Sequence, residues 1–201
     1  MTVDKKSLNK NSFKRTLIIV ALLNLAYFFI EFLVALKINS VSLFADSIDF
    51  LEDTFVNLLI FFSFFITSSL RPKISKILVI IILLPGLAAL WTAWQQIVKP
   101  STPEAFDLTL VGLGALLVNF ICTIVLMDFR KNKESLMKAA FLSARNDVLS
   151  NLAIITAGLV IMIYPSIWPD LIVGIIIFLI NFDAAYKVYQ IAKNEGTNLA
   201  S

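Results

Sequence analysis

Four carboxylates crowd into the nine residues 45–53, ADSIDFLED. The four are Asp46, Asp49, Glu52 and Asp53. Because a helix advances by about 100° per residue, Asp46, Asp49 and Asp53 fall within an arc of roughly 60°, whereas Glu52 points away from them. Ser42 and Asn57 lie on the same stripe. Carboxylate oxygens are ligands that divalent cations prefer. The spacing therefore indicates a cation site on one face of a helix.

A second polar stripe occupies residues 143–150. Its members share one helix face, and they are Ser143, Asn146, Asp147 and Ser150. If the two stripes face each other, Asp49, Asp53 and Asp147 can converge between two helices. Asp46 fits three roles: a group behind the metal ligands, which we favour, a group facing water, or a hydrogen-bonding partner of another helix.

These acids lie in apolar surroundings and need compensation. An ionised acid in hydrocarbon costs at least ~2.5 kcal/mol, so a cation, a proton or an internal arginine must offset the charge. A divalent cation cancels most of it, and without the metal the crowded carboxylates favour protonation. Metal and protons would then exclude each other, as a metal/proton antiporter requires. Alternatively, an intramembrane acid can hydrogen-bond a neighbouring helix or face a wet cavity.

The charged residues off these stripes indicate a structural role. Glu52 and Arg145 point away from the polar faces, and we expect them to form structural ion pairs, with Glu31 as a further candidate partner. Cys122 is expected to pack in the core. Because it is the single cysteine, intrachain disulfides and thiolate metal clusters are excluded. Histidine is absent, so no imidazole can bind metal or carry protons.

The acids are embedded in long apolar stretches. The chain has 201 residues, and 59% of them are apolar, which is typical of a polytopic membrane protein. Six stretches are long enough to cross a bilayer, so we predict an all-α fold with six transmembrane helices. The predicted spans are 17–37, 41–70, 75–97, 107–128, 137–164 and 169–191.

The net charge of +3 reflects topology. Basic residues concentrate before the first span and in the loops near 71–76 and 129–138, so we expect these segments and both termini in the cytoplasm. A nucleic-acid partner is not indicated, because the cations form no single stripe. We divide the chain into a basic N-terminal segment 1–16, a transmembrane domain 17–191 and a short tail 192–201.

The second and fifth predicted spans resemble the cation diffusion facilitator, or cation efflux, family of metal/proton antiporters. The stretch NSVSLFADSIDFLEDTFVNLL is similar to the family's second helix, and it places the two ligands on Asp49 and Asp53. LSARNDVLSN is similar to the fifth helix, where Asp147 matches the second ligand and Ser143 stands at the position of the usual histidine. WPDLIVGIIIFLINFDAAYKVY is similar to the sixth helix. The resemblance implies that four helices rock against the other pair.

Two departures from the family pattern change the expectations. With Ser143 in place of histidine, the site holds oxygen ligands, which weakens a preference for zinc and admits harder ions. Ser143 is thus a weak ligand candidate, and Asn146 or water is a weak candidate for the fourth position. The family's cytoplasmic C-terminal domain is not present in the sequence, so a homodimer would form through the membrane helices.

We therefore expect a transporter that exports a divalent metal from the cytoplasm across a bacterial inner membrane in exchange for protons. The metal (Zn, Mn, Fe, Co or Cd) is the substrate, and no permanently bound cofactor is expected. The alternative is a metal-binding sensor or partner subunit that does not transport. An enzyme is not expected, because neither the Asp-Gly…Ala-Arg…Gly…Asp signature of phosphatidyl-alcohol transferases nor the Gly-x-Gly-Asp motif of intramembrane proteases occurs.

Overall fold

The computed structural model describes residues 5–63, 65, 87, 89–127 and 135–180, and the side chains of all of these except 5–10, 63, 135–143 and 145. Every regular element within these residues is a helix, which confirms the predicted all-α class. The long helices are α1 (Lys5–Ile38), α2 (Val41–Ser63), α4 (Ala105–Leu126) and α5 (Ser135–Ile163). Two shorter helical segments, 89–98 and Trp168–Ile180, bring the described helices to six.

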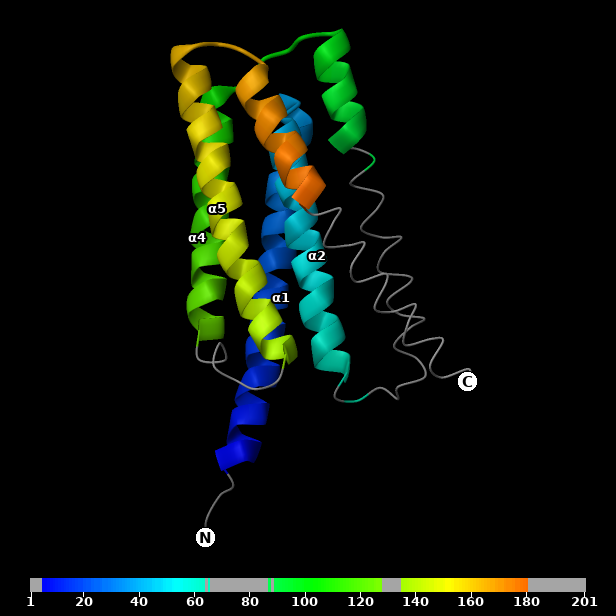
Figure 1. Cartoon of the computed structure of the whole chain (residues 1–201), viewed down its shortest axis with the longest axis vertical. Coiled ribbons are helices and arrows are strands. Elements are labelled where there is room, and N and C mark those ends of the chain that lie inside the picture. The colour runs from blue at the N-terminus through cyan, green and yellow to red at the C-terminus, as the bar shows by residue number, and fades with distance from the viewer. Residues whose placement is uncertain (1–4, 64, 66–86, 88, 128–134, 181–201) are drawn as a thin grey trace, which may run out of the picture.

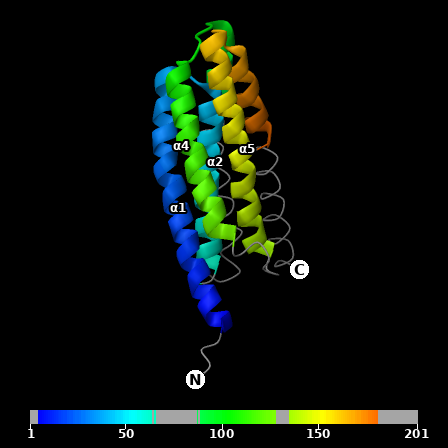
Figure 2. The ribbon, with the colours of Figure 1, turned by 90° about the vertical axis from the view of Figure 1, so that its left-hand side faces the viewer.

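The helices form an elongated antiparallel bundle (Figure 1). α1 packs mainly along α2, and α4 packs mainly along α5; the two pairs meet through α1 with α4 and α2 with α5 (Figure 2). We call the end that holds the α1–α2 turn the outer end, because the predicted orientation places it outside the cell. The segments 89–98 and Trp168–Ile180 lie at this end.

Three described helices are long and apolar enough to cross a membrane: Asn11–Ile38, Ala105–Leu126 and Asn146–Ile163. α2 has the length but carries the four acids. The helix that contains the first predicted span extends beyond it toward the N-terminus, because it begins at Lys5. Its polar first turns contain neither glycine nor proline, so nothing in them interrupts a helix. Much of the predicted third span and the end of the sixth lie outside the described residues.

The turn between α1 and α2 is tight because both helix ends are capped within it. Asn39 adopts a left-handed conformation (φ 56°), and the N–H of Ser40 donates to the carbonyl of Ala35 at 3.1 Å. This is the hydrogen bond that closes a helix whose next residue is left-handed, and asparagine tolerates that conformation better than most residues. The Ser40 hydroxyl then accepts from the N–H of Leu43 at 3.2 Å and so caps α2.

Asp170, at the start of the segment Trp168–Ile180, completes the cap of α2. Its fully buried carboxylate accepts hydrogen bonds from the N–H groups of Val41 (2.8 Å) and Ser42 (3.2 Å). It also accepts from three side chains, the hydroxyls of Ser40 and Ser42 and the amide of Gln96. A carboxylate at a helix N-terminus satisfies N–H groups without partners and interacts favourably with the helix dipole. Asp170 therefore joins α2, segment 89–98 and the sixth helix at the outer end.

Apolar packing reinforces this joint. Val41, Ala93 and Leu171 come from the same three helices and form one buried cluster. Gly174 lets the sixth helix approach α2 so closely that a Cβ atom there would lie 2.7 Å from the backbone of Ser42. A larger residue at position 174 would therefore push the sixth helix away from the capped end of α2.

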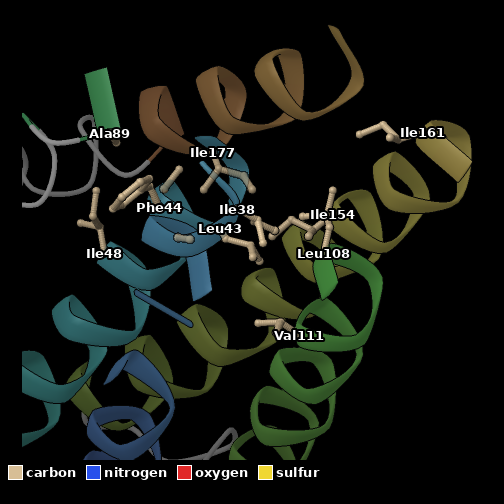
Figure 3. Packing of buried hydrophobic residues seen from close by; sticks show 12 residues of the cluster. Ile38, Leu43, Phe44, Ile48, Ala89, Leu108, Val111, Ile154, Ile161 and Ile177 are labelled. Atoms are coloured by element: carbon tan, nitrogen blue, oxygen red, sulfur yellow. The ribbon is translucent and has the colours of Figure 1, made fainter. Parts of the chain in front are cut away.

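Two apolar layers enclose the middle of the bundle. The layer nearer the outer end, which we call the outer layer, contains Leu43, Phe44 and Ile48 of α2. They pack near Leu108 of α4 and Ile154 of α5 (Figure 3). The inner layer is a separate buried cluster, and its members include Phe13, Leu17, Ile60, Leu126 and Ala144. Because Asp49 and Asp53 follow Ile48 and precede Ile60 on α2, the acids lie between the two apolar layers.

We expect Asp170→Ala to lower the free energy of unfolding by about 2–4 kcal/mol, because it removes a charged acceptor and leaves buried donors unpaired. Urea unfolding of the purified protein in detergent, followed by circular dichroism, measures this change. Asp107→Ala is the matched control, since Asp107 forms an ion pair with the exposed Lys37 near the same end and should cost less than about 1 kcal/mol. Equal losses in the two variants would contradict the role of Asp170.

Candidate metal site

Asp53 of α2 and Asp147 of α5 form the centre of the candidate site. Asp53 is 6% exposed and Asp147 is partly buried. Their carboxyl groups lie within hydrogen-bonding reach of each other, and the charges of Asp49 and Asp46 also act on Asp147. The structure therefore brings together one acid from each predicted stripe, across the contact between α2 and α5.

Asn24 of α1 is a further member of the site that the sequence did not predict. Its side chain is fully buried, and its amide donates to Oδ2 of Asp53 at 3.3 Å. On the other side, the Cys122 thiol lies 3.6 Å from the Asn24 carbonyl oxygen. Cys122 packs in the inner apolar layer as predicted, and it also supports this amide. A lone asparagine in the apolar first span was the available signal.

Asp49 is only partly buried and interacts electrostatically with Asp147. Among the described residues, no three Asp, Glu or Cys side chains are arranged to hold a metal ion. The structure thus brings Asp53 and Asp147 together without gathering Asp49 into a complete ligand set. Ser143 lies within α5, and its side chain is outside the described part of the chain.

A cleft of about 320 Å³ leads to Asp147 between α5 and the sixth helix. Asn146, Asp147 and Ser150 give it a polar side, and its other lining is apolar, including Val173 and Ile177. Asn146 is exposed and lines this cleft, and its role as a ligand stays a prediction. The fifth-helix stripe therefore borders an open space as well as α2.

Two of the other residues on the second-helix stripe have roles outside the candidate site. Ser42 donates its hydroxyl to Asp170, so it belongs to the outer joint. Asn57 donates its amide to the backbone carbonyl of Asp53 at 2.7 Å, within α2 itself. An angular position on one helix predicts a shared face, but it does not predict which neighbouring group each residue meets.

Asp46 and Glu31 meet each other. Both are fully buried, and their side chains interact directly across the contact between α1 and α2. The described neighbour of Glu31 is therefore another acid. Sequence position alone could not show this, since Glu31 and Asp46 lie on different helices. Because the side chain of Arg145 lies outside the described residues, the predicted ion pair with Glu31 stays a prediction.

Glu52 keeps one buried oxygen, Oε2, that has no hydrogen-bond partner among the described residues. The side chain of Arg145 lies outside the described set, so the predicted pairing of these two residues stays a prediction. Within the described residues, Lys37 and Asp107 form the one ion pair, at 2.9 Å. It joins α1 to α4 near the outer end.

We expect Asn24→Ala to weaken divalent-metal binding by roughly 10–100-fold, because groups that orient metal ligands typically contribute that much. Calorimetric titration of the purified protein with Mn²⁺, and separately with Zn²⁺, measures the affinity. Cys122→Ala is the matched control, because it removes the thiol beside the Asn24 carbonyl oxygen and keeps the hydrogen bond from the Asn24 amide to Asp53. Equal affinity of Asn24→Ala and the wild type would exclude a role for Asn24 in the site.

The chain was compared with known proteins. Residues 17–199, which include all six predicted spans, match the family model of the cation efflux transmembrane domain. A search of curated proteins gave no match. The match confirms the predicted resemblance and the polytopic membrane fold, and the proteins of this family are transporters rather than enzymes. The chain belongs to the cation efflux family, whose members transport metal cations across membranes.

Proposed function

We propose that this protein is a divalent metal/proton antiporter that exports metal from the cytoplasm, with Asp49, Asp53 and Asp147 as metal ligands. The observation that carries the proposal is the contact between the carboxyl groups of Asp53 and Asp147, on two helices of a cation efflux domain. Asn24 supports it, because its amide orients one oxygen of Asp53. Asp49 would join the other two acids in the metal-bound state.

Exchange follows from the chemistry of two adjacent buried acids. Two carboxylates in contact cannot both stay ionised in poor solvent, so the pair holds either a proton or a cation. Metal ligands must be deprotonated, so metal binding releases protons and proton binding releases metal. If the site opens to one side at a time, this competition couples metal movement in one direction to proton movement in the other.

The ligand chemistry favours hard or borderline cations. Carboxylates suit manganese, and they also bind zinc, but the chain offers no imidazole to favour zinc. Ser143 at the position of the family's histidine, and Asn146 or water at the fourth position, would complete the set of oxygen ligands. Zinc, manganese, iron, cobalt and cadmium are therefore all candidate substrates, with manganese favoured more than in relatives that carry histidine.

The direction of transport follows from the predicted topology. With the basic segments in the cytoplasm, both termini lie on the cytoplasmic side of a bacterial inner membrane and the α1–α2 turn faces outward. A homodimer would form through the membrane helices. Rocking of α1, α2, α4 and α5 against the remaining two helices would give alternating access, with the Asp170 joint keeping α2 attached to them at the outer end.

A metal-binding sensor or partner subunit is the second candidate. The same carboxylates would bind metal in such a protein, but no metal would cross the membrane. The cleft beside Asp147 favours transport over this alternative, because it provides an open space next to a ligand between two helices.

Proteoliposomes with an acidic lumen should take up Mn²⁺ or Zn²⁺ from outside, because protons leaving the lumen drive metal inward. We expect Asp49→Ala to slow initial uptake by roughly tenfold or more, since loss of a ligand should cost at least as much as loss of a group that orients one. Asp107→Asn is the control and should transport normally. Metal binding with no uptake above that of Asp49→Ala would support the sensor.

Ser143→His should shift metal preference from manganese toward zinc, because imidazole is a better ligand for zinc than a hydroxyl is. Competition binding of Mn²⁺ and Zn²⁺ to the purified variant measures the ratio of affinities. Thr156→His, on an exposed position of the same helix, controls for histidine elsewhere on α5. An unchanged ratio in Ser143→His would show that position 143 does not face the ion.

A further inference from the structure

Glu31 and Asp46 form a second pair of acids in the membrane region, separate from the contact between Asp53 and Asp147. Both side chains are 0% exposed, and they lie within hydrogen-bonding reach of each other. None of their four carboxyl oxygens accepts a hydrogen bond from an N–H or O–H group of the described residues. The pair therefore lacks the donors that normally accompany buried carboxylates.

The groups around the pair do not supply a positive charge. The charges of both acids act on the Tyr27 hydroxyl, but this hydroxyl donates to the carbonyl of Val111 at 2.6 Å. The other titratable groups that act on the pair are acidic: Asp49 acts on Glu31, and Asp46 interacts with Asp147. The ammonium group of Lys37, also on α1, is paired with Asp107. Every described charge that faces the pair is thus negative.

A single proton bound between the two carboxyl groups would remove their repulsion. Two ionised carboxylates in contact, with no donor among the described residues, would repel each other in a medium that solvates neither. If one acid carries a proton, its O–H donates to the other carboxylate and makes a strong charge-assisted hydrogen bond. One proton removes one charge and supplies the missing donor at the same time.

We propose that Glu31 and Asp46 form a proton-binding site that holds one proton between their carboxyl groups and releases it when a divalent cation binds to Asp49, Asp53 and Asp147. The second half of this statement rests on the proposed function; the shared proton does not. The proton leaves to solvent as the cation arrives, so the positive charge of the metal replaces that of the proton.

The coupling between the two sites is electrostatic. Asp49 lies close enough to affect Glu31, and Asp147 close enough to be affected by Asp46, so a doubly charged cation between Asp49 and Asp147 acts on both members of the pair. A nearby positive charge favours the ionised form of an acid. Metal binding would then release one proton from this pair, in addition to the protons displaced from the metal ligands themselves.

Two measurements on the purified protein in detergent test the proposal, with Glu31→Gln and Asp46→Asn as the variants. Each amide keeps the side-chain shape and donates an N–H to the remaining carboxylate, so the fold should be retained without the proton. Asp107→Asn is the control, because it removes an acid that is already ion-paired. The first measurement is the infrared carbonyl band of protonated carboxyl groups, recorded in the absence of metal. The second is the number of protons released per Mn²⁺ bound.

We expect the wild type and Asp107→Asn to show the protonated-carboxyl band at neutral pH, and Glu31→Gln and Asp46→Asn to lose part of it. We expect both pair variants to release about one proton fewer per bound Mn²⁺ than the wild type.

An unchanged band in both pair variants would overturn the shared proton, and an unchanged proton count would overturn its release by metal. A second Mn²⁺ that binds to the wild type and not to the pair variants would show that the pair holds metal instead. If the wild type binds no metal, the proposed function fails, while loss of the band still supports the proton site.

Discussion

Asp53 and Asp147 place two carboxyl groups within hydrogen-bonding reach inside a membrane bundle, and such a contact is stable only when a proton or a cation reduces its charge. The arrangement of the bundle is consistent with this constraint. Apolar layers lie on both sides of the acids along the bundle, and the amide of Asn24 donates a hydrogen bond to Asp53. In the proposed function, the affinity of these acids for exchangeable positive charge is what a cation transporter needs.

Three buried acids differ in the groups that surround their carboxylates. Asp170 accepts five hydrogen bonds, which satisfy the start of α2 and join three helices. Asp53 accepts a hydrogen bond from the Asn24 amide and has an acidic neighbour, Asp147. Asp46 has no donor among the described residues, and its neighbour is Glu31. Protein groups satisfy Asp170, whereas in our proposals Asp53 and Asp46 bind ions that can leave.

The sequence predicted those features that depend on a single helix. Apolar length predicted the helices, and angular spacing predicted that Asp53 and Asp147 belong to polar faces. It did not predict which groups meet across helices, because a periodic pattern contains no information about neighbours distant in the chain. Asp170 caps a helix nearly 130 residues away in the chain. Ser42 therefore donates its hydroxyl to Asp170 at the outer joint, although it lies on the same helix stripe as the acids. The sequence likewise did not predict that Asp46 is a neighbour of Glu31, and the only signal for Asn24 was its polarity in an apolar span.

The central claim is that one set of carboxylates exchanges metal for protons, and counterflow tests it most directly. Proteoliposomes prepared without a pH gradient, containing a pH-sensitive dye, receive Mn²⁺ on the outside only. The account predicts that the lumen becomes more alkaline as metal enters, because protons leave in exchange, and that Asp53→Asn abolishes both movements. Entry of metal without any change in lumenal pH, measured with the bilayer otherwise tight to protons, would contradict it.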